Sequence, residues 1–233
     1  RTAWQHPIPS AVFVPSMNYA QFLKSQISAA DLSFLGIHFI TPGQCWTLLH
    51  DKLGIKQKAA SRENLHLLLA ATAEQFPKTL SAQSVAKDPS NLMRSLDHLS
   101  AAGWQTIDIG IPSLVPTMEK FREFLDRAEL TTAQVIDKQL VQEAGKQSPV
   151  FHSLLVIGFD GSHWQIYNLL QAAVSVAKTA KFCLFEPRPT AEATDQMWIS
   201  SWEELYGEAK MLQESEHSKT FTFLTEAMEY RSA

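Results

Sequence analysis

The feature that most constrains the fold is a nearly continuous apolar run, FHSLLVIGF, at residues 151–159. A strand with one face on water alternates apolar and polar residues, whereas a continuous run is typical of a strand covered on both faces. Such strands belong to parallel sheets, which are connected by helices packed over both faces. The run therefore predicts an α/β protein in which this strand is central in a parallel sheet.

Three more strands are predicted from short runs rich in Val, Ile and Phe, at residues 11–16, 36–40 and 181–186. A helical pattern at residues 17–28 follows the first run, and another at 163–178 precedes the last. After the second run, Thr41 and Pro42 have the residue types of a helix start, and Gly54 marks its end. Together these units predict a parallel, Rossmann-like sheet of the P-loop type, covered by helices.

Between residues 55 and 149 the pattern changes to helix after helix, with almost no strand signal. Start and stop residues agree with the hydrophobic period there: Ser61, Asp88, Gly103 and Gly145. We expect an inserted helical subdomain at 55–149. It would divide the α/β core into a first part, 1–54, and a second part with C-terminal helices, 150–233.

Composition narrows the classes of protein further. The 233 residues are 45% hydrophobic and contain two cysteines, which predicts a real core, no disulfide framework and a reducing compartment, the cytoplasm. No run of about 18 apolar residues is present, so we expect no membrane span. The chain begins at Arg1, and we expect it to be part of a longer protein. The net charge is −4 and the basic residues are scattered, so no nucleic-acid footprint is evident.

No complete catalytic or cofactor motif is present. A Walker A loop needs a glycine-rich turn, yet no glycine precedes Gly36, so we expect no ATP binding and no cofactor. Cys45 and His50 are five residues apart on a predicted helix and face different sides, so we expect no metal site. Ser16 follows a strand without a glycine elbow, which argues against a nucleophile. We therefore name no catalytic residue.

Asp160 is the best single acidic candidate, because it follows the central strand where α/β proteins place ligand-binding groups. An aspartate followed by glycine at a strand end is more often a turn former or helix cap, and we favour that interpretation. His163 could relay protons beside it, although a first-turn histidine next to an aromatic residue is usually packed.

Several short steps occur in a suggestive order: Val14-Pro15-Ser16, then Ile40-Thr41-Pro42, then a helical segment at 56–147, then VIGFDGSHWQIYNLLQAA at 156–173. This series resembles the N-terminal helicase-like region of AddB- or RecC-type subunits of bacterial helicase–nucleases. The resemblance implies a superfamily 1 helicase-like first domain whose strand-end loops contact single-stranded DNA. Ser16 and Thr41 are the DNA-binding residues that it implies, and a helicase or nuclease subunit is the implied partner.

The chain departs from active relatives at the Walker B position. Active members have Asp-Glu there to hold magnesium, whereas this strand ends in Gly158-Phe159-Asp160. The resemblance therefore implies a degenerate, non-catalytic domain that acts as a scaffold or as a guide for single-stranded DNA. Two alternatives remain open: a Rossmann-like small-molecule enzyme with a pocket at Asp160 and His163, and a protein-interaction module whose helical insertion binds a partner.

Overall fold

The structure is a computed structural model, and it describes residues 7–101, 110–112 and 114–210. The chain divides into two compact units, Arg1–Trp198 and Ile199–Ala233. The sheet and the candidate site belong to the first unit. Helix α9, Glu192–Tyr206, begins in the first unit and ends in the second. Among the described residues, no helix combines the length and the apolar character that crossing a membrane requires.

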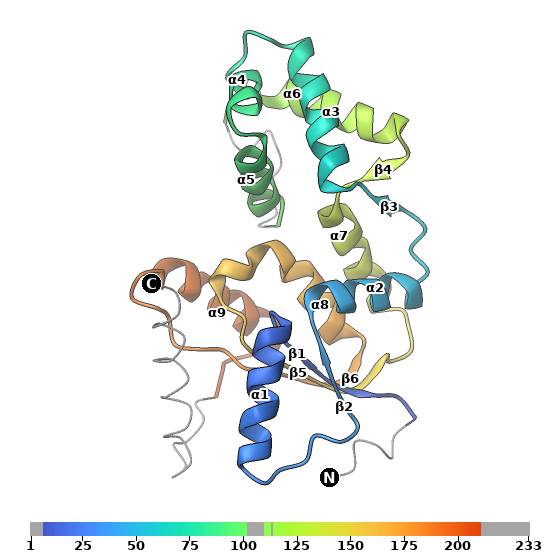
Figure 1. Ribbon diagram of the computed structural model, residues 1–233, viewed down its shortest axis with the longest axis vertical. Coiled ribbons are helices and arrows are strands. Elements are labelled where there is room, and N and C mark those ends of the chain that lie inside the picture. Colours follow the sequence, from blue (N-terminus) through green and yellow to red (C-terminus); the bar gives the residue numbers. More distant parts are fainter. Residues whose placement is uncertain (1–6, 102–109, 113, 211–233) are drawn as a thin grey trace. The chain divides into compact units, whose positions relative to one another are not determined.

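The first unit is built on a four-stranded parallel sheet, in which the strand order is β2-β1-β5-β6 (Figure 1). Its strands are β1, Ser10–Phe13; β2, Ile37–Ile40; β5, Phe151–Val156; and β6, Ala177–Phe182. All three pairings are parallel. This confirms the predicted α/β class with a parallel sheet flanked by helices, and it is consistent with a Rossmann-like fold.

The two inner strands carry the burial that their sequences predict. All four residues of β1 are buried, and Phe151, Leu154 and Val156 of β5 are buried as well. Ser10 is the polar member of β1, and its Oγ accepts a hydrogen bond of 2.9 Å from the Ser153 hydroxyl of β5. The prediction that the 151–159 run supplies an inner strand is therefore confirmed.

Two predicted boundaries are wrong near the end of the sheet. The last strand is Ala177–Phe182 rather than 181–186, because it is an edge strand of mostly exposed residues and lacks an apolar run. The helix expected at 163–178 is two helices, a 3-10 helix η3 at Gly161–Ile166 and α8 at Tyr167–Ser175. The central strand ends at Val156, before the positive φ of +91° at Gly158.

Helices α1, Met17–Ala29, and α2, Pro42–Lys52, follow the first two strands at the predicted places. Ala20 of α1 packs with Val12, Val14 and Ile157 in one buried cluster. Because parallel crossovers are right-handed, α1 and α8 lie over opposite faces of the sheet, and Figure 1 shows α1 in front of it. Helix α8 in turn contacts α2 and α7, Ala133–Ala144.

The connection from β2 to β5 contains most of the remaining helices. These are α3, Arg62–Gln75; α4, Leu80–Lys87; α5, Pro89–Ala101; and α6, Leu114–Arg127. Five buried residues form their core: Leu69, Val85, Met93, Phe121 and Leu125. A short parallel pair that the sequence did not indicate, β3 at Lys58–Ala59 and β4 at Leu130–Thr131, joins the ends of this segment. The predicted stop at Gly103 lies outside the described residues.

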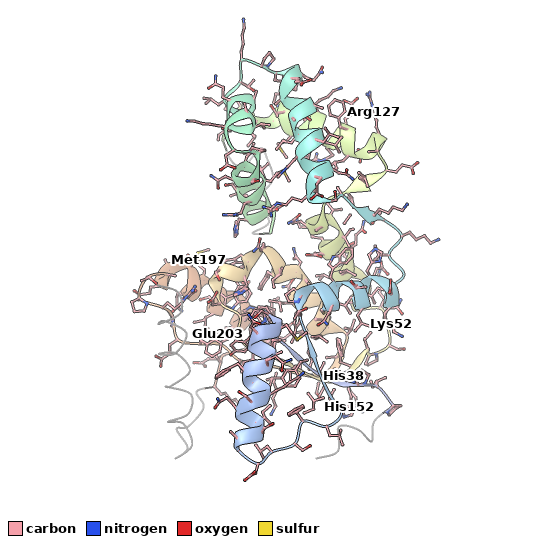
Figure 2. The ribbon with its side chains drawn as sticks, viewed as in Figure 1. His38, Lys52, Arg127, His152, Met197 and Glu203 are labelled. Atoms are coloured by element: carbon pink, nitrogen blue, oxygen red, sulfur yellow. The ribbon has the colours of Figure 1, made fainter. Side chains whose placement is uncertain are left out.

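Local capping explains where several of these helices begin and end. The Ser61 hydroxyl accepts from the Asn64 amide at 3.2 Å, and the Asp88 carboxylate accepts from the Asn91 amide at 3.0 Å. Basic residues at the last turns of α2 and α6, Lys52 and Arg127, are exposed and complement the negative ends of the helix dipoles (Figure 2).

All of these helices lie within the unit Arg1–Trp198, so a separate subdomain at 55–149 stays a prediction.

Candidate functional site at the carboxyl edge of the sheet

The residues singled out from the sequence all follow strands at one edge of the sheet. Phe13, the last residue of β1, is in register with Ile40 of β2 and with Val156 of β5. The segments that follow these three strands therefore emerge at the same carboxyl edge. They contain Ser16, Thr41 and the segment Gly158-Phe159-Asp160. Open α/β sheets bind ligands at this edge. The binding crevice lies at the topological switch point, between neighbouring strands whose connecting helices cover opposite faces of the sheet.

Ser16 and Thr41 occupy the N-cap positions of α1 and α2. The Ser16 hydroxyl accepts a hydrogen bond of 3.2 Å from the amide of Tyr19, and Ser16 itself is exposed. At the second helix, the side-chain oxygen of Gln44 accepts from the Thr41 amide at 3.0 Å and from the Thr41 hydroxyl at 3.2 Å. Ser16 therefore caps α1 with its side chain, whereas Thr41 holds the N-cap position of α2 with its hydroxyl donating to Gln44. DNA contact by these residues stays a prediction.

Gly158 brings the loop after β5 against the start of α1. A β-carbon at Gly158 would lie 2.9 Å from Pro15 Cδ and 2.9 Å from Tyr19 Cε1, and the φ of +91° also favours glycine. Tyr19 packs against the cluster of Val12, Val14 and Ile157, and burial raises the pKa of its phenol. The crevice between the loops after β1 and β5 is therefore occupied by the protein's own side chains.

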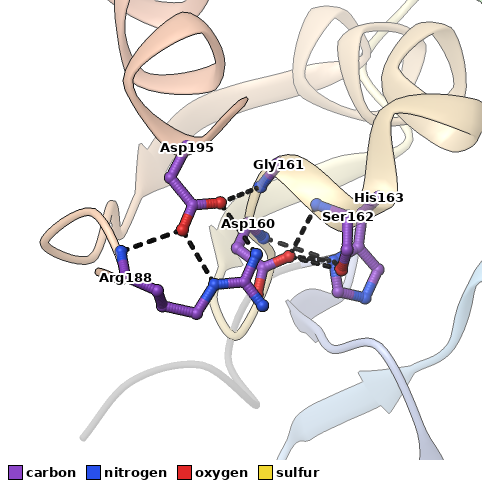
Figure 3. Close-up of polar contacts among 6 residues, drawn as sticks. All are labelled: Asp160, Gly161, Ser162, His163, Arg188 and Asp195. Atoms are coloured by element: carbon purple, nitrogen blue, oxygen red, sulfur yellow. Dashed lines mark hydrogen bonds and ion pairs between the residues drawn. The ribbon is translucent and has the colours of Figure 1, made fainter. Parts of the chain in front are cut away.

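Asp160 is held by several hydrogen bonds at the start of η3 (Figure 3). Its Oδ1 accepts from the Ser162 amide at 2.9 Å and from the Ser162 hydroxyl at 2.5 Å, and it lies 3.0 Å from His163 Nδ1. Its Oδ2 forms an ion pair of 3.0 Å with the Arg188 guanidinium. The interpretation of Asp160 as a helix cap is thus confirmed, and Arg188 adds an ionic partner that the sequence did not indicate.

Arg188 joins Asp160 to a second, buried carboxylate, Asp195 (Figure 3). Asp195 Oδ2 accepts from the backbone amide of Arg188 at 3.0 Å and from its Nε at 2.8 Å. Asp195 Oδ1 accepts from Arg188 NH2 at 2.8 Å and from the amide of Gly161 at 3.1 Å. We call Asp160, Arg188, Asp195 and the Gly161 amide the Arg188 network.

The electrostatics of the Arg188 network keep both carboxylates ionised. Hydrogen bonds from Arg188 lower the pKa of Asp195. Partial burial by itself would raise the pKa of Asp160, but hydrogen bonds from His163 and Ser162 outweigh it and hold that pKa well below its usual range. The hydrogen bonds to Asp195 raise the pKa of Arg188. Two carboxylates thus share one guanidinium, and the network ties the loop after β5 to the start of α9.

One nitrogen of His163 lies against Asp160 of the Arg188 network, and the other does not. Nδ1 lies 3.0 Å from Asp160 Oδ1 and 3.3 Å from the Asp160 amide, so the tautomer decides which of these two bonds forms. Within the part of the chain that the structure describes, Nε2 forms no hydrogen bond. The ring packs edge-on against Phe159, with centroids 5.2 Å apart. With the proton on Nδ1, Nε2 is a free proton acceptor oriented by Asp160.

Sequence reasoning missed Arg188 and Asp195. They are only seven residues apart, but their carboxylate partner Asp160 lies on another segment, and contact between segments leaves no periodic signal. One local signal does exist, because Arg188 stands between Pro187 and Pro189, which restrict the backbone on both sides. An arginine fixed in this way after a strand is a candidate for a structural ion pair.

A separate, partly buried pair lies between α2 and α7. Trp46 Nε1 donates a hydrogen bond of 3.0 Å to Asp137 Oδ1, and Asp137 is 5% exposed. Burial, only partly opposed by the bond from Trp46, raises the pKa of Asp137 to about 7. Burial also raises the pKa of the Cys45 thiol beside it. Among the described residues, no group of three or more His, Cys, Asp or Glu side chains is arranged to hold a metal ion.

Comparison of the chain with protein-family models gives no match, and comparison with curated proteins gives none either. The resemblance to helicase–nuclease subunits therefore rests on the short sequence steps alone.

Proposed function

We propose that this chain is a non-catalytic, helicase-like domain of a bacterial DNA-repair helicase–nuclease, and that it guides single-stranded DNA along the carboxyl edge of its sheet. In the same proposal, residues 55–149 form an inserted helical subdomain with its own buried core. The observation that carries the proposal is the set of internal contacts made by the residues that follow β1 and β5. The positions that bind nucleotide and magnesium in active relatives are occupied here by internal contacts.

Two of these contacts support a non-catalytic role. A strand-end carboxylate that holds magnesium must have free oxygen lone pairs, and in this chain both oxygens of Asp160 are engaged by Ser162, His163 and Arg188. Pro15 and Tyr19 lie against Gly158, where a bound phosphate would need open space. An arginine beside the carboxylate also repels a divalent cation. These contacts favour a scaffold or guide over a nucleotide hydrolase.

The helix N-termini support a role in guiding DNA. Helices α1 and α2 start directly after β1 and β2, so both present their first-turn amides at the carboxyl edge. Helix N-termini attract phosphate, because free amides and the helix dipole act together. Ser16 and Thr41 at these two caps would contact the DNA backbone, which fixes its position without reading its sequence.

The test uses labelled single-stranded oligonucleotide and fluorescence anisotropy. We would compare the wild type with the double variant Ser16→Asp and Thr41→Asp, because aspartate is also a good N-cap and adds only negative charge at the edge. We expect wild-type binding that weakens with rising salt, and a Kd about tenfold weaker in the double variant, equivalent to ~1.4 kcal/mol. Thr79→Asp, at the N-cap of α4, is the matched control and should bind like the wild type.

Absence of wild-type binding at low salt would refute the guiding role. Equal affinity of the wild type and the double variant would remove Ser16 and Thr41 from the DNA contact. Hydrolysis of ATP by the purified chain, lost on mutation of Asp160, would contradict the non-catalytic assignment.

A second candidate is a Rossmann-like small-molecule enzyme. The observation that favours it is the Asp160–His163 pair, in which His163 Nε2 forms no hydrogen bond to any described residue. In that case His163 would act as a general base oriented by Asp160. The test is a screen of simple ester and phosphoester substrates with the wild type and with His163→Gln. Turnover that the variant loses, with unchanged thermal stability, would support this candidate. The protein-interaction module stays an untested prediction.

A further inference from the structure

A cavity of about 400 Å³ lies apart from the Arg188 network, among α3, α5 and η3. Its volume falls within the range of about 300–1,000 Å³ that is usual for ligand sites. Gln165 of η3 lines the cavity, so the cavity adjoins the segment that follows β5. We call it the α3–α5 pocket, and its helical lining is Arg62, Leu65, His66, Met93, Arg94 and Asp97.

Within the described residues, no carboxylate is bonded to the two arginines of the α3–α5 pocket, and Arg62 interacts with Asp97 and Glu63 only electrostatically. Arg62 and Arg94 are both exposed, and within the described residues neither guanidinium forms an ion pair or a hydrogen bond. Arg188, by contrast, is held by two carboxylates. Arg62 is also the first residue of α3, where the helix dipole adds positive potential. Free guanidinium groups in a concave site are well suited to a phosphate, which they bind with two parallel hydrogen bonds.

Within the described residues, His66 and Asp97 of the same pocket form no hydrogen bond or ion pair, although the charges of His98 and Arg62 act on Asp97. His66 Nε2 is shut off from solvent and has no hydrogen-bond partner among the described residues, an arrangement that costs about 1–3 kcal/mol. Asp97 forms no ion pair in that part of the chain, and burial raises the pKa of its carboxyl. A ligand with its own hydrogen-bond donors and acceptors would satisfy Asp97, and it would reach His66 Nε2 after that ring turns into the pocket.

Apart from Gln165, the remaining wall is apolar. Leu65 is partly buried and Met93 is 6% exposed, and both pack in the helical core. Within the part of the chain that the structure describes, the pocket thus combines guanidinium groups without a hydrogen-bonded partner, polar groups without hydrogen bonds, and an apolar surface. A nucleotide has the complementary parts, which are a phosphate, a base edge with donors and acceptors, and an apolar base face.

We infer that the α3–α5 pocket binds one nucleotide unit of the guided single strand. Arg62 and Arg94 bind its phosphate, and Leu65 and Met93 contact the face of its base. Asp97 and Gln165 form hydrogen bonds to the base edge, and His66 joins them once its ring turns into the pocket. The inference rests on the proposed function, because it assigns to the DNA strand a second contact next to the carboxyl edge.

The experiment measures single-strand binding by the full chain at several salt concentrations. The variant is Arg62→Gln with Arg94→Gln. The charge-matched control is Arg122→Gln with Arg127→Gln, on α6 and outside the pocket. We expect the pocket variant to bind at least tenfold more weakly. The slope of log K against log salt should fall by about 0.7, the value for one phosphate of a single strand. The control should stay close to the wild type.

A second variant, Arg62→Lys with Arg94→Lys, keeps the charges but loses the paired hydrogen bonds. It should keep most of the salt slope and lose part of the affinity. Circular dichroism of each variant verifies the fold. Wild-type binding that the pocket variant retains in full would overturn the inference and leave the proposed function standing, whereas absence of wild-type binding would overturn the proposed function.

A deoxynucleoside monophosphate provides the other arm of the test. Weak binding of the mononucleotide, followed by calorimetry and lost in the pocket variant, would support a nucleotide site. If the mononucleotide binds tightly and the oligonucleotide does not, the pocket serves a free nucleotide, and its assignment to a DNA strand is wrong.

Discussion

Replacing Asp195 by alanine should destabilise the fold by about 2–3 kcal/mol. Among the described residues, Asp195 is the side-chain acceptor of the buried Gly161 amide, and its loss costs about 1–3 kcal/mol for a group that water cannot reach. Arg188 has a side chain that is 44% exposed, so water replaces much of its ion pair, and we assign about 0.5–1 kcal/mol to that part. Asp195→Asn keeps an oxygen that can accept from Gly161, so its cost should be about 1 kcal/mol.

Urea unfolding, with linear extrapolation of the free energy to water, measures these differences. Asp126→Asn, an exposed residue on α6, is the chemically matched control and should change the free energy of unfolding by less than about 0.5 kcal/mol. A loss in Asp195→Ala no larger than in this control would refute the reasoning. Equal losses in the alanine and asparagine variants would show that the Gly161 amide does not contribute.

The pH dependence gives an independent check on Asp195. Because its folded pKa is lowered, its ionised form stabilises the protein above the unfolded pKa of about 3.9, and this stability is lost as the pH falls through the folded pKa. The difference between the wild type and Asp195→Asn should therefore be full at pH 7 and shrink below about pH 4.

Two further substitutions test other parts of the fold. Asp137 has a raised folded pKa of about 7, so its burial destabilises the ionised form, and stability should fall as the pH rises from 4 to 7. Asp137→Asn should therefore be more stable than the wild type at pH 8, by about 1–3 kcal/mol, and this gain should vanish near pH 4 in urea titrations. Gly158→Ala should lose about 2–3 kcal/mol through strain at φ +91° and contact with Pro15, whereas Gly43→Ala, which meets nothing within 4 Å, should be neutral or stabilising in thermal unfolding.

The inner strands of the sheet could be predicted from the sequence because buried strands consist mainly of apolar residues. β5 is covered on both faces, and its apolar run is a direct record of that environment. The edge strand β6 has exposed residues such as Lys178 and Lys181 and therefore lacks an apolar run. The strand was predicted too far along the chain, at 181–186, because the apolar residues lie there. Helix starts at Thr41 and Ser61 were predicted correctly because capping depends on neighbours along the chain.

The candidate site was only partly predictable. The positions of Ser16, Thr41 and Asp160 at one edge follow from the parallel topology, which the sequence does indicate. The Arg188–Asp195 contact and the α3–α5 pocket depend on how distant segments pack, and packing of that kind has no period in the sequence. The short β3–β4 pair is two residues on each side, too brief to produce an alternating pattern.

The pairing of β1 with β5 has a consequence for folding. Ser10 and Ser153 form a hydrogen bond although 143 positions separate them, so the centre of the sheet closes a very long loop. The entropic cost of closure grows only slowly with length, about 0.6 kcal/mol per doubling, but contacts of this range slow folding strongly. Helices α3 to α6 have a local core that shortens the effective loop. We expect these helices to gain protection in pulsed hydrogen exchange before β1 and β5 do, and simultaneous protection would show that sheet and helices fold as one step.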